Sequence, residues 1–201
     1  MSMEKLNAAI IGMGFIGRQH YEALRRLTGV HIRAICVSRP EHIERTKAEF
    51  DADYVTADWR EIMADPEIHT VHNCTPNIAH DEVNLAAVSA GKHIYAEKPM
   101  SITTEGAEKV AAAAKAAGVA NAINHQYRMN AAVLEMRARI AAGMSGKILY
   151  VSGRYMQDSV ARHDDYTPRR IPETSPARAL LDIGVHWADT ASFVTGAPRK
   201  K

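Results

Sequence analysis

Short apolar runs alternate with amphipathic segments through the first 123 residues, and this alternation predicts strands separated by helices. Each predicted strand is short and is bounded by glycine, proline or polar residues. Strands that alternate with helices favour a parallel sheet with helices on both faces. We therefore predict a doubly wound α/β domain, a Rossmann domain, over residues 1–123, with strands at 6–11, 30–37, 54–55, 70–74, 93–96 and 119–123.

The pattern changes in kind after residue 123. A polar segment, 124–130, leads into a predicted helix at 131–142. Alternation at 147–156 predicts a long strand in a new sheet, and 157–175 is a charged, proline-containing loop. A last helical run follows. We expect residues 124–201 to form a second, α+β domain.

Composition excludes several classes of protein. The chain has 201 residues, 46% of them hydrophobic, which is enough to bury a core, and its net charge of +2 gives no basic face for nucleic acid or an anionic membrane. Cys36 and Cys74 lie in apolar runs without the spacing of a metal site or a disulfide framework, so no metal is expected. No signal peptide or membrane-length apolar run is present, which predicts a cytoplasmic protein.

The first predicted strand leads directly into a Gly-x-Gly-x-x-Gly turn made by Gly12, Gly14 and Gly17. In the order strand, glycines, helix, this motif is the dinucleotide fingerprint. Gly12 makes the tight turn, Gly14 lets the backbone approach a pyrophosphate, and Gly17 lets the helix pack on the strand. The phosphates would rest on the N–H groups that begin the helix, at Phe15 and Ile16. The alternative is a tight turn without a ligand.

The end of the second predicted strand bears on the choice of nucleotide. An acid about 20 residues after the glycines usually binds the ribose diol of NAD. Val37, Ser38 and Arg39 stand there instead, and Ser38 with Arg39 can donate hydrogen bonds to a 2′-phosphate. We predict that NADP is preferred, with NAD as the alternative cofactor. In the alternative interpretation Arg39 is a solvated loop cation.

The fourth predicted strand ends in Thr75, Pro76 and Asn77, and His80 follows near the start of the next helix. These are polar groups at the carboxyl edge of the sheet, where ligands of open α/β sheets bind. We interpret them as cofactor-binding residues. The alternative is a helix cap punctuated by proline, with His80 as a capping or surface histidine.

Lys98 is the first candidate for chemistry. The fifth predicted strand delivers Glu97, Lys98 and Pro99 at its carboxyl end. A lysine there is a compact cation that can polarise an oxygen or carry a proton. A sharp turn at this point would aim the amine at the cofactor, which raises the hypothesis of a cis Lys98–Pro99 bond. The alternative is a solvated lysine after a core strand.

Asp182 and His186 form a second candidate pair. Four residues separate them in a helical run, so both project from one face and can converge on one ligand. A neighbouring acid raises the basicity of an imidazole, as proton transfer requires. A buried histidine whose hydrogen bonds are satisfied is the alternative.

Taken together, these motifs resemble the glucose-fructose oxidoreductase and inositol dehydrogenase family, Gfo/Idh/MocA. The resemblance covers nearly the whole chain, and the Glu-Lys-Pro and Asp-x-x-x-His motifs are its specific parts. It is carried by Gly12–Gly17, Cys74–Asn77 with His80, Ala90–His93 leading into Glu97–Pro99, Tyr127–Arg128 and Asp182–His186.

The resemblance implies an amino-terminal Rossmann domain, a second domain on a mostly antiparallel sheet, and hydride transfer between a nicotinamide cofactor and a sugar, polyol or related hydroxy compound. Lys98 then takes the catalytic lysine position, and Asp182 and His186 the paired polar residues over the substrate. Glu97, Lys98 and Arg128 join the cofactor-binding residues. A glycosidase that oxidises its sugar transiently on bound NAD is the alternative enzyme, and a nucleotide-binding remnant without turnover is the alternative without catalysis.

The chain stops at 201 residues where members of that family continue for more than a hundred, so it is expected to be a truncated member with an incomplete α+β domain. Residues 124–201 would then be a partial substrate and oligomerisation domain, through which a homo-oligomer forms. One strand with one helix leaves sheet edges and an apolar face open. We expect Val151, Ile183, Trp187 and Phe193 to form an exposed apolar patch that drives association.

Overall fold

The computed structural model describes residues 5–157 and 177–196, and the chain divides into two compact units at the boundary between Asn124 and His125. Unit 1 is built on a six-stranded sheet in the order β3-β2-β1-β4-β5-β6, and all of its neighbouring strands are parallel. The predicted doubly wound sheet is confirmed. Its strands are β1 (Leu6–Ile11), β2 (Val30–Cys36), β3 (Tyr54–Thr56), β4 (Thr70–Asn73), β5 (His93–Ala96) and β6 (Asn121–Ile123).

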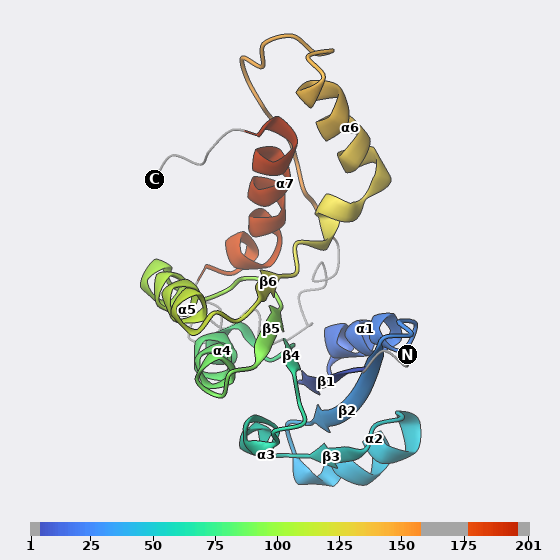
Figure 1. Ribbon diagram of the computed structural model, residues 1–201. Helices are drawn as coiled ribbons and strands as arrows, with labels where there is room; N and C mark the ends of the chain where they lie inside the picture. The colour runs from blue at the N-terminus through green and yellow to red at the C-terminus, as the bar shows by residue number, and fades with distance from the viewer. Residues whose placement is uncertain (1–4, 158–176, 197–201) are drawn as a thin grey trace. The chain divides into compact units, whose positions relative to one another are not determined.

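Helices cover both faces of this sheet (Figure 1). One face carries α1 and α2, and the other carries α3, α4 and α5. Side-chain caps begin two of these helices: Asp58 caps α3 and Thr103 caps α5, each with its side-chain oxygen accepting a backbone N–H. The helices are α1 (Phe15–Leu24), α2 (Ile43–Glu49), α3 (Trp59–Ala64), α4 (His80–Ser89) and α5 (Thr104–Ala117), with 3-10 turns η1 (Pro40–His42) and η2 (Asn77–Ala79) before α2 and α4.

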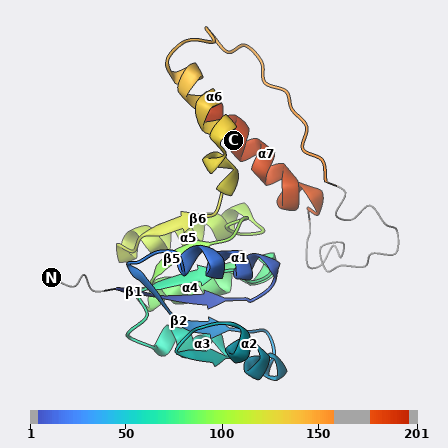
Figure 2. The same cartoon turned by 90° about the vertical axis from the view of Figure 1, so that its right-hand side faces the viewer.

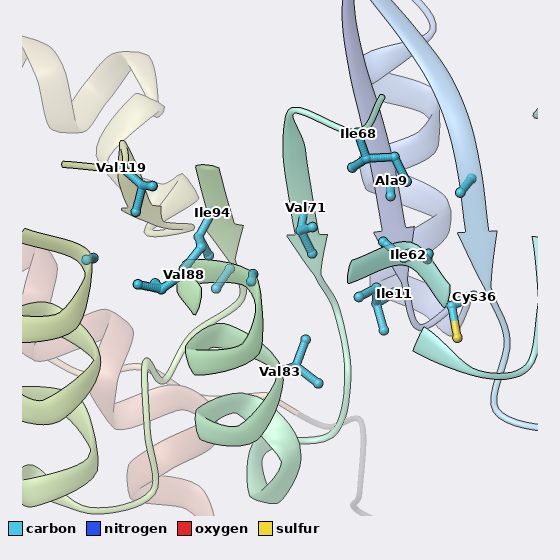
Figure 3. Close-up of a cluster of buried hydrophobic side chains, with 14 residues drawn as sticks. Ala9, Ile11, Cys36, Ile62, Ile68, Val71, Val83, Val88, Ile94 and Val119 are labelled. Carbon is cyan, nitrogen blue, oxygen red and sulfur yellow. The ribbon is translucent and has the colours of Figure 1, made fainter. Parts of the chain in front are cut away.

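The core of the α3–α5 face joins the middle strands to α4 (Figure 3). Ile11, Val71 and Ile94 come from three adjacent strands and are at most 5% exposed. Val83 and Val88 from α4 pack in the same cluster. Burying each such side chain stabilises the fold by about 1.5–3 kcal/mol, so this cluster fixes the strand ends that carry the candidate site.

Unit 2 contains two packed helices, α6 (Ala131–Ala141) and α7 (Val185–Thr195), which lie side by side in Figure 2. A 3-10 turn, η3 (Gln126–Met129), precedes α6, and a π-helical turn, Leu180–Gly184, precedes α7. The guanidinium of Arg137 on α6 lies over the ring of Phe193 on α7, 4.2 Å from its centroid. Nowhere in the described ranges is there a helix long and apolar enough to cross a membrane.

The strand predicted at 147–156 is wrong. Residues 147–157 carry no strand pairing, and the described part of unit 2 contains no strand at all. Alternation makes a segment suitable for a sheet, but only hydrogen bonds to a neighbouring strand make it one. Leu149 and Tyr150 are accordingly 84% and 83% exposed. The loop predicted at 157–175 lies, from residue 158 onward, outside the described residues.

A buried lysine ties the loop after α3 to the start of β5. Lys92 is 3% exposed, and its Nζ donates to the backbone oxygens of Asp65 (2.6 Å) and Ile68 (3.0 Å). In Lys92→Met the stem keeps its packing while both carbonyls lose their donor. We expect the free energy of unfolding, measured by urea denaturation, to fall by about 1.5–3 kcal/mol. Lys109→Met, at an exposed position of α5, is the matched control, and an equal effect in both variants would contradict this role.

Candidate active site

The turn between β1 and α1 leaves open space at Gly14. Gly12 has a φ of +97°, and a Cβ there would lie 2.5 Å from the carbonyl oxygen of Cys74. A Cβ at Gly17 would collide with the carbonyl oxygen of Gly12. At Gly14, by contrast, no atom beyond its chain neighbours lies within 4 Å of the Cβ position. Two glycines are therefore required by the protein's own packing, whereas the third faces a space that a ligand can enter.

The first turn of α1 suits a pyrophosphate. Phe15, 79% exposed, and half-buried Ile16 begin the helix, and Gly14 as N-cap supplies no side-chain hydrogen bond. The first turn also carries no acidic residue. Uncapped N–H groups at a helix start attract anions. The residues present therefore fit a dinucleotide.

Ser38 and Arg39 follow β2, and both are exposed. The backbone N–H of Gly12 donates to the carbonyl of Cys36 at 2.9 Å, which holds the glycine turn beside the end of β2. Arg39 makes a long ion pair with Glu41, 3.7 Å between Nη1 and Oε1, with both side chains more than 60% exposed. Such a pair is weak, so Arg39 can turn to another anion at little cost.

The turn after β4 is held by a buried asparagine and a buried histidine. Asn73 Oδ1 accepts from the Thr75 hydroxyl at 2.7 Å. His80 is fully buried, with its Nε2 2.9 Å from the carbonyl oxygen of Thr75 and its Nδ1 2.6 Å from that of Pro99. Pro76 is exposed and Asn77 is half-exposed, so those two can contact a ligand. The structure thus places His80 between two turns, with its side chain fully buried.

The Glu97–Lys98–Pro99 turn ends β5, and its Lys98–Pro99 peptide bond is cis, as hypothesised. Lys98 is half-exposed, and Pro99 is buried with its carbonyl oxygen 2.6 Å from Nδ1 of His80. Through His80 this turn is joined to Thr75, and the Cβ position of Gly12 lies 3.1 Å from the Thr75 backbone nitrogen. Three predicted elements of the site therefore meet at one edge of the sheet.

A buried polar network on the α1 face of the sheet supports the same turn, and sequence reasoning missed most of it. Glu97 is 5% exposed, and its Oε1 lies 3.2 Å from Nε2 of His20 and accepts from Nδ2 of Asn124 at 2.6 Å. The Nδ1 atoms of His20 and His72 face each other at 3.0 Å. The hydroxyl of Tyr95 donates to Asn124. The available signal was polar residues at alternate positions of β4 and β5, whose side chains point away from the core of the α3–α5 face.

Burial and hydrogen bonding set the charges in this network. Burial alone would raise the pKa of Glu97, but hydrogen bonds from His20 and Asn124 outweigh it, and the pKa is lowered. Glu97 is therefore a buried carboxylate. The pKa of His72 is lowered to about 3, mainly because burial disfavours the imidazolium and also because of the charge of His20.

In unit 2, His186 lies in an aromatic cluster that sequence reasoning also missed. Its ring is 6% exposed and meets the Tyr127 ring edge-on, with 4.7 Å between centroids. The hydroxyls of Tyr127 and Tyr155 are hydrogen-bonded to each other. The pKa of Tyr155 is raised to about 12 by burial, by that hydrogen bond and by other contributions that include the charge of Asp182. Asp182 is half-buried and lies in the π-helical turn before α7. The predicted pair is therefore divided between a π-helical turn, which holds Asp182, and the α-helix α7, which holds His186.

Arg128, which the sequence predicts to bind cofactor, forms a bidentate ion pair within unit 2. Its Nε and Nη2 donate to the two carboxylate oxygens of Asp189 at 2.7 and 2.5 Å, and Asp189 is 2% exposed. These hydrogen bonds raise the pKa of Arg128. Its guanidinium also lies 5.3 Å from the ring centroid of Phe193. The observed role is to fasten η3 to α7.

Among the described residues, no cluster of three or more His, Cys, Asp and Glu side chains is arranged to hold a metal ion. The thiols of Cys36 and Cys74 are free and buried. Burial raises the pKa of both, that of Cys36 to about 12, so neither is a ready nucleophile.

Two family models match this chain. Residues 6–125 match a model described as oxidoreductase family, NAD-binding Rossmann fold, and residues 133–201 match the GFO/IDH/MocA C-terminal domain.

Characterised relatives match along nearly the whole chain. Levoglucosan dehydrogenase of Pseudarthrobacter phenanthrenivorans is 33% identical over 96% of this chain and 52% of its own length. A scyllo-inositol 2-dehydrogenase (NADP(+)) of Bacillus subtilis is 31% identical over 98% of this chain and 54% of its own. A structure of levoglucosan dehydrogenase in complex with NADH superposes with a TM-score of 0.90, covering 96% of this chain and 54% of that one. The chain thus spans about half the length of the relatives it matches.

The low pKa of His72 has a consequence for stability. The pKa of His72 is about 3 in the folded protein, against an ordinary value of 6.5. Its contribution to stability is therefore complete above pH 6.5 and is lost as the pH falls toward 3. In that range the unfolded chain binds a proton at His72 and the folded protein does not. Between pH 6.5 and 5 this term should reduce the free energy of unfolding by up to about 1.4 kcal/mol per pH unit.

The measurement is urea unfolding from pH 7.5 to 5 of the wild type and of His72→Asn, whose side chain does not titrate but still places a polar group near His20. We expect a shallower decline in the variant. His42→Asn, at a half-buried position of η1, is the control and should follow the wild type. An equally steep decline in His72→Asn would show that His72 does not contribute this term.

Proposed function

This chain belongs to the Gfo/Idh/MocA family of NAD-binding oxidoreductases, and we propose that it takes part in hydride transfer between a nicotinamide cofactor and a sugar, polyol or related hydroxy compound. The observation that carries the proposal is the meeting of an open glycine turn with the Lys98 turn at one edge of the sheet. The named activities of the relatives, dehydrogenases of levoglucosan and of inositols, support the substrate class.

The proposed cofactor site uses backbone groups of the first turn of α1 for the pyrophosphate and Thr75, Pro76 and Asn77 for the remainder of the nucleotide. The bound nicotinamide supplies the carbon that gives or takes the hydride. His80 and Glu97 act indirectly in this proposal, because both side chains are buried and hold turns.

Lys98 is proposed to hold the substrate oxygen as negative charge develops on it. An ammonium group at a fixed strand end stabilises such charge without reorganising at the moment of reaction. His186 is proposed to accept the hydroxyl proton, with Asp182 supporting its basicity. The edge-on contact with Tyr127 fixes the plane of the imidazole, which proton transfer along one direction requires.

We also propose that the protein self-associates through unit 2. The segment Ile148–Val151 is apolar, and each of its residues is at least 39% exposed. Exposed apolar stretches of this kind favour association. Of the four residues predicted to form an exposed apolar patch, Val151 and Trp187 are 42% and 36% exposed, whereas Ile183 and Phe193 are half-buried.

The decisive experiment is a turnover screen with NAD and NADP across sugars and polyols, followed by absorbance at 340 nm. A dehydrogenase changes this absorbance in proportion to product. A glycosidase that oxidises its sugar only transiently releases product without a net change, and a nucleotide-binding remnant binds cofactor without product. Either of the last two outcomes would reject the proposed reaction.

Lys98→Ala should lower kcat/KM by about 100-fold or more, because it removes charge stabilisation that acts in the transition state. The dissociation constant for the cofactor should stay within a few-fold of wild type, since Lys98 is proposed to contact the substrate. Lys115→Ala, at an exposed position of α5, is the matched control. A Lys98→Ala variant that keeps most of its kcat would remove Lys98 from the mechanism.

Arg39 should favour NADP. Both Ser38 and Arg39 are exposed after β2, and Val37 stands where an acid usually binds the ribose diol of NAD. Arg39→Ala should weaken NADP binding by about 1.5–3 kcal/mol, the range for a charged hydrogen bond, and leave NAD binding unchanged. Fluorescence titration of both cofactors measures this, with exposed Arg45→Ala as control. NAD binding tenfold more tightly than NADP to the wild type would refute the preference.

A further inference from the structure

Glu97 carries a buried charge whose partners come from three different elements. One carboxylate oxygen lies 3.2 Å from Nε2 of His20 on α1 and accepts from Nδ2 of Asn124 after β6, and the other accepts from the backbone N–H of Lys98 at 3.3 Å. A buried carboxylate costs several kcal/mol unless such partners are kept. The position of Glu97 is therefore determined by where these donors are.

Among these partners, His20 has a distinctive place in the fold. It lies in α1, six residues after Gly14, so about 9 Å of rigid helix separates it from the turn that faces the open space. Its side chain is 6% exposed, and it reaches across to the end of β5. Hydrogen bonds therefore run from α1 through the carboxylate of Glu97 to the backbone of Lys98.

We propose that His20 is a positioning residue that sets the Lys98 turn through Glu97. The two ring nitrogens have separate tasks: Nε2 holds Glu97, while Nδ1 faces Nδ1 of His72 at 3.0 Å. The helix proposed to receive the cofactor is thereby coupled to the residue proposed to act on the substrate. The inference rests on the proposed function only in the role it gives Lys98.

The two tasks of His20 can be separated by substitution. A glutamine places its amide nitrogen at about the distance of Nε2 from the backbone, so His20→Gln can still donate to Glu97. An asparagine reaches only about as far as Nδ1, so His20→Asn can still meet His72 but leaves Glu97 without this donor. If His20 were only a packed core histidine, the shorter and longer amides would have similar effects on Lys98.

The experiment compares His20→Gln and His20→Asn in the 201-residue chain. Lysine labelled with ¹³C at Cε reports on Lys98, whose resonance is assigned by its loss in Lys98→Arg. We expect the Lys98 resonance to move in His20→Asn and to stay near its wild-type position in His20→Gln. Gln19→Asn, at the exposed neighbouring position of α1, controls for placing asparagine in this helix and should leave the resonance unmoved.

Kinetics give a second readout. In His20→Asn kcat should fall by about tenfold or more, the equivalent of one charged hydrogen bond, while the dissociation constant for NADH or NADPH stays within about threefold. His20→Gln should retain kcat within about threefold. Equal effects of the two variants on both the Lys98 resonance and kcat, or an unmoved resonance in folded His20→Asn, would overturn the proposal.

If His20→Asn does not fold, Glu97→Gln gives the same test from the other side of the hydrogen bond. It keeps the shape of the side chain but replaces a carboxylate oxygen by a nitrogen that cannot accept. We expect it to move the Lys98 resonance, and an unmoved resonance would overturn the proposal. A wild-type chain that turns over no sugar or polyol would reject the proposed function alone, because the resonance still reports whether His20 positions Lys98.

Discussion

The parallel pairing of β1 with β4 is the constraint on which the candidate site depends. Its register sets Ile11 opposite Asn73, so both strands end at the same level of the sheet. The glycine turn after β1 then lies against the backbone of Cys74 and Thr75, closely enough that no side chain fits at Gly12. The sheet order changes direction at this pair, which is where doubly wound sheets bind their ligands.

The Lys98 turn is braced from both faces of the sheet. On the face of α4, His80 links the carbonyls of Thr75 and Pro99. On the face of α1, Glu97 is held by His20 and by Asn124. A side chain on a strand end fixed from two directions keeps its geometry when a ligand arrives, which is the property a catalytic group needs.

Unit 2 combines a firmly held interior with an open apolar segment. The Arg128–Asp189 ion pair and the stacking of Arg137 on Phe193 join η3 and α6 to α7. Residues 147–157, by contrast, have the alternating pattern of a strand and no strand beside them in the described part of the unit. Local pattern can prepare a segment for a sheet, but the sheet itself is a property of two or more segments.

The sequence by itself determined the order of strands and helices in unit 1, the glycine turn and the polar residues at the ends of β4 and β5. Each depends on local physics: periodicity, caps and the conformational freedom of glycine. Only the tertiary structure decided that His80 links two turns, that Arg128 pairs with Asp189, and that His20 reaches Glu97 across 77 positions of the chain. A buried polar group needs a hydrogen-bond partner, and the fold can supply that partner from a residue far away in the sequence. No local pattern in the sequence identifies which residue this will be.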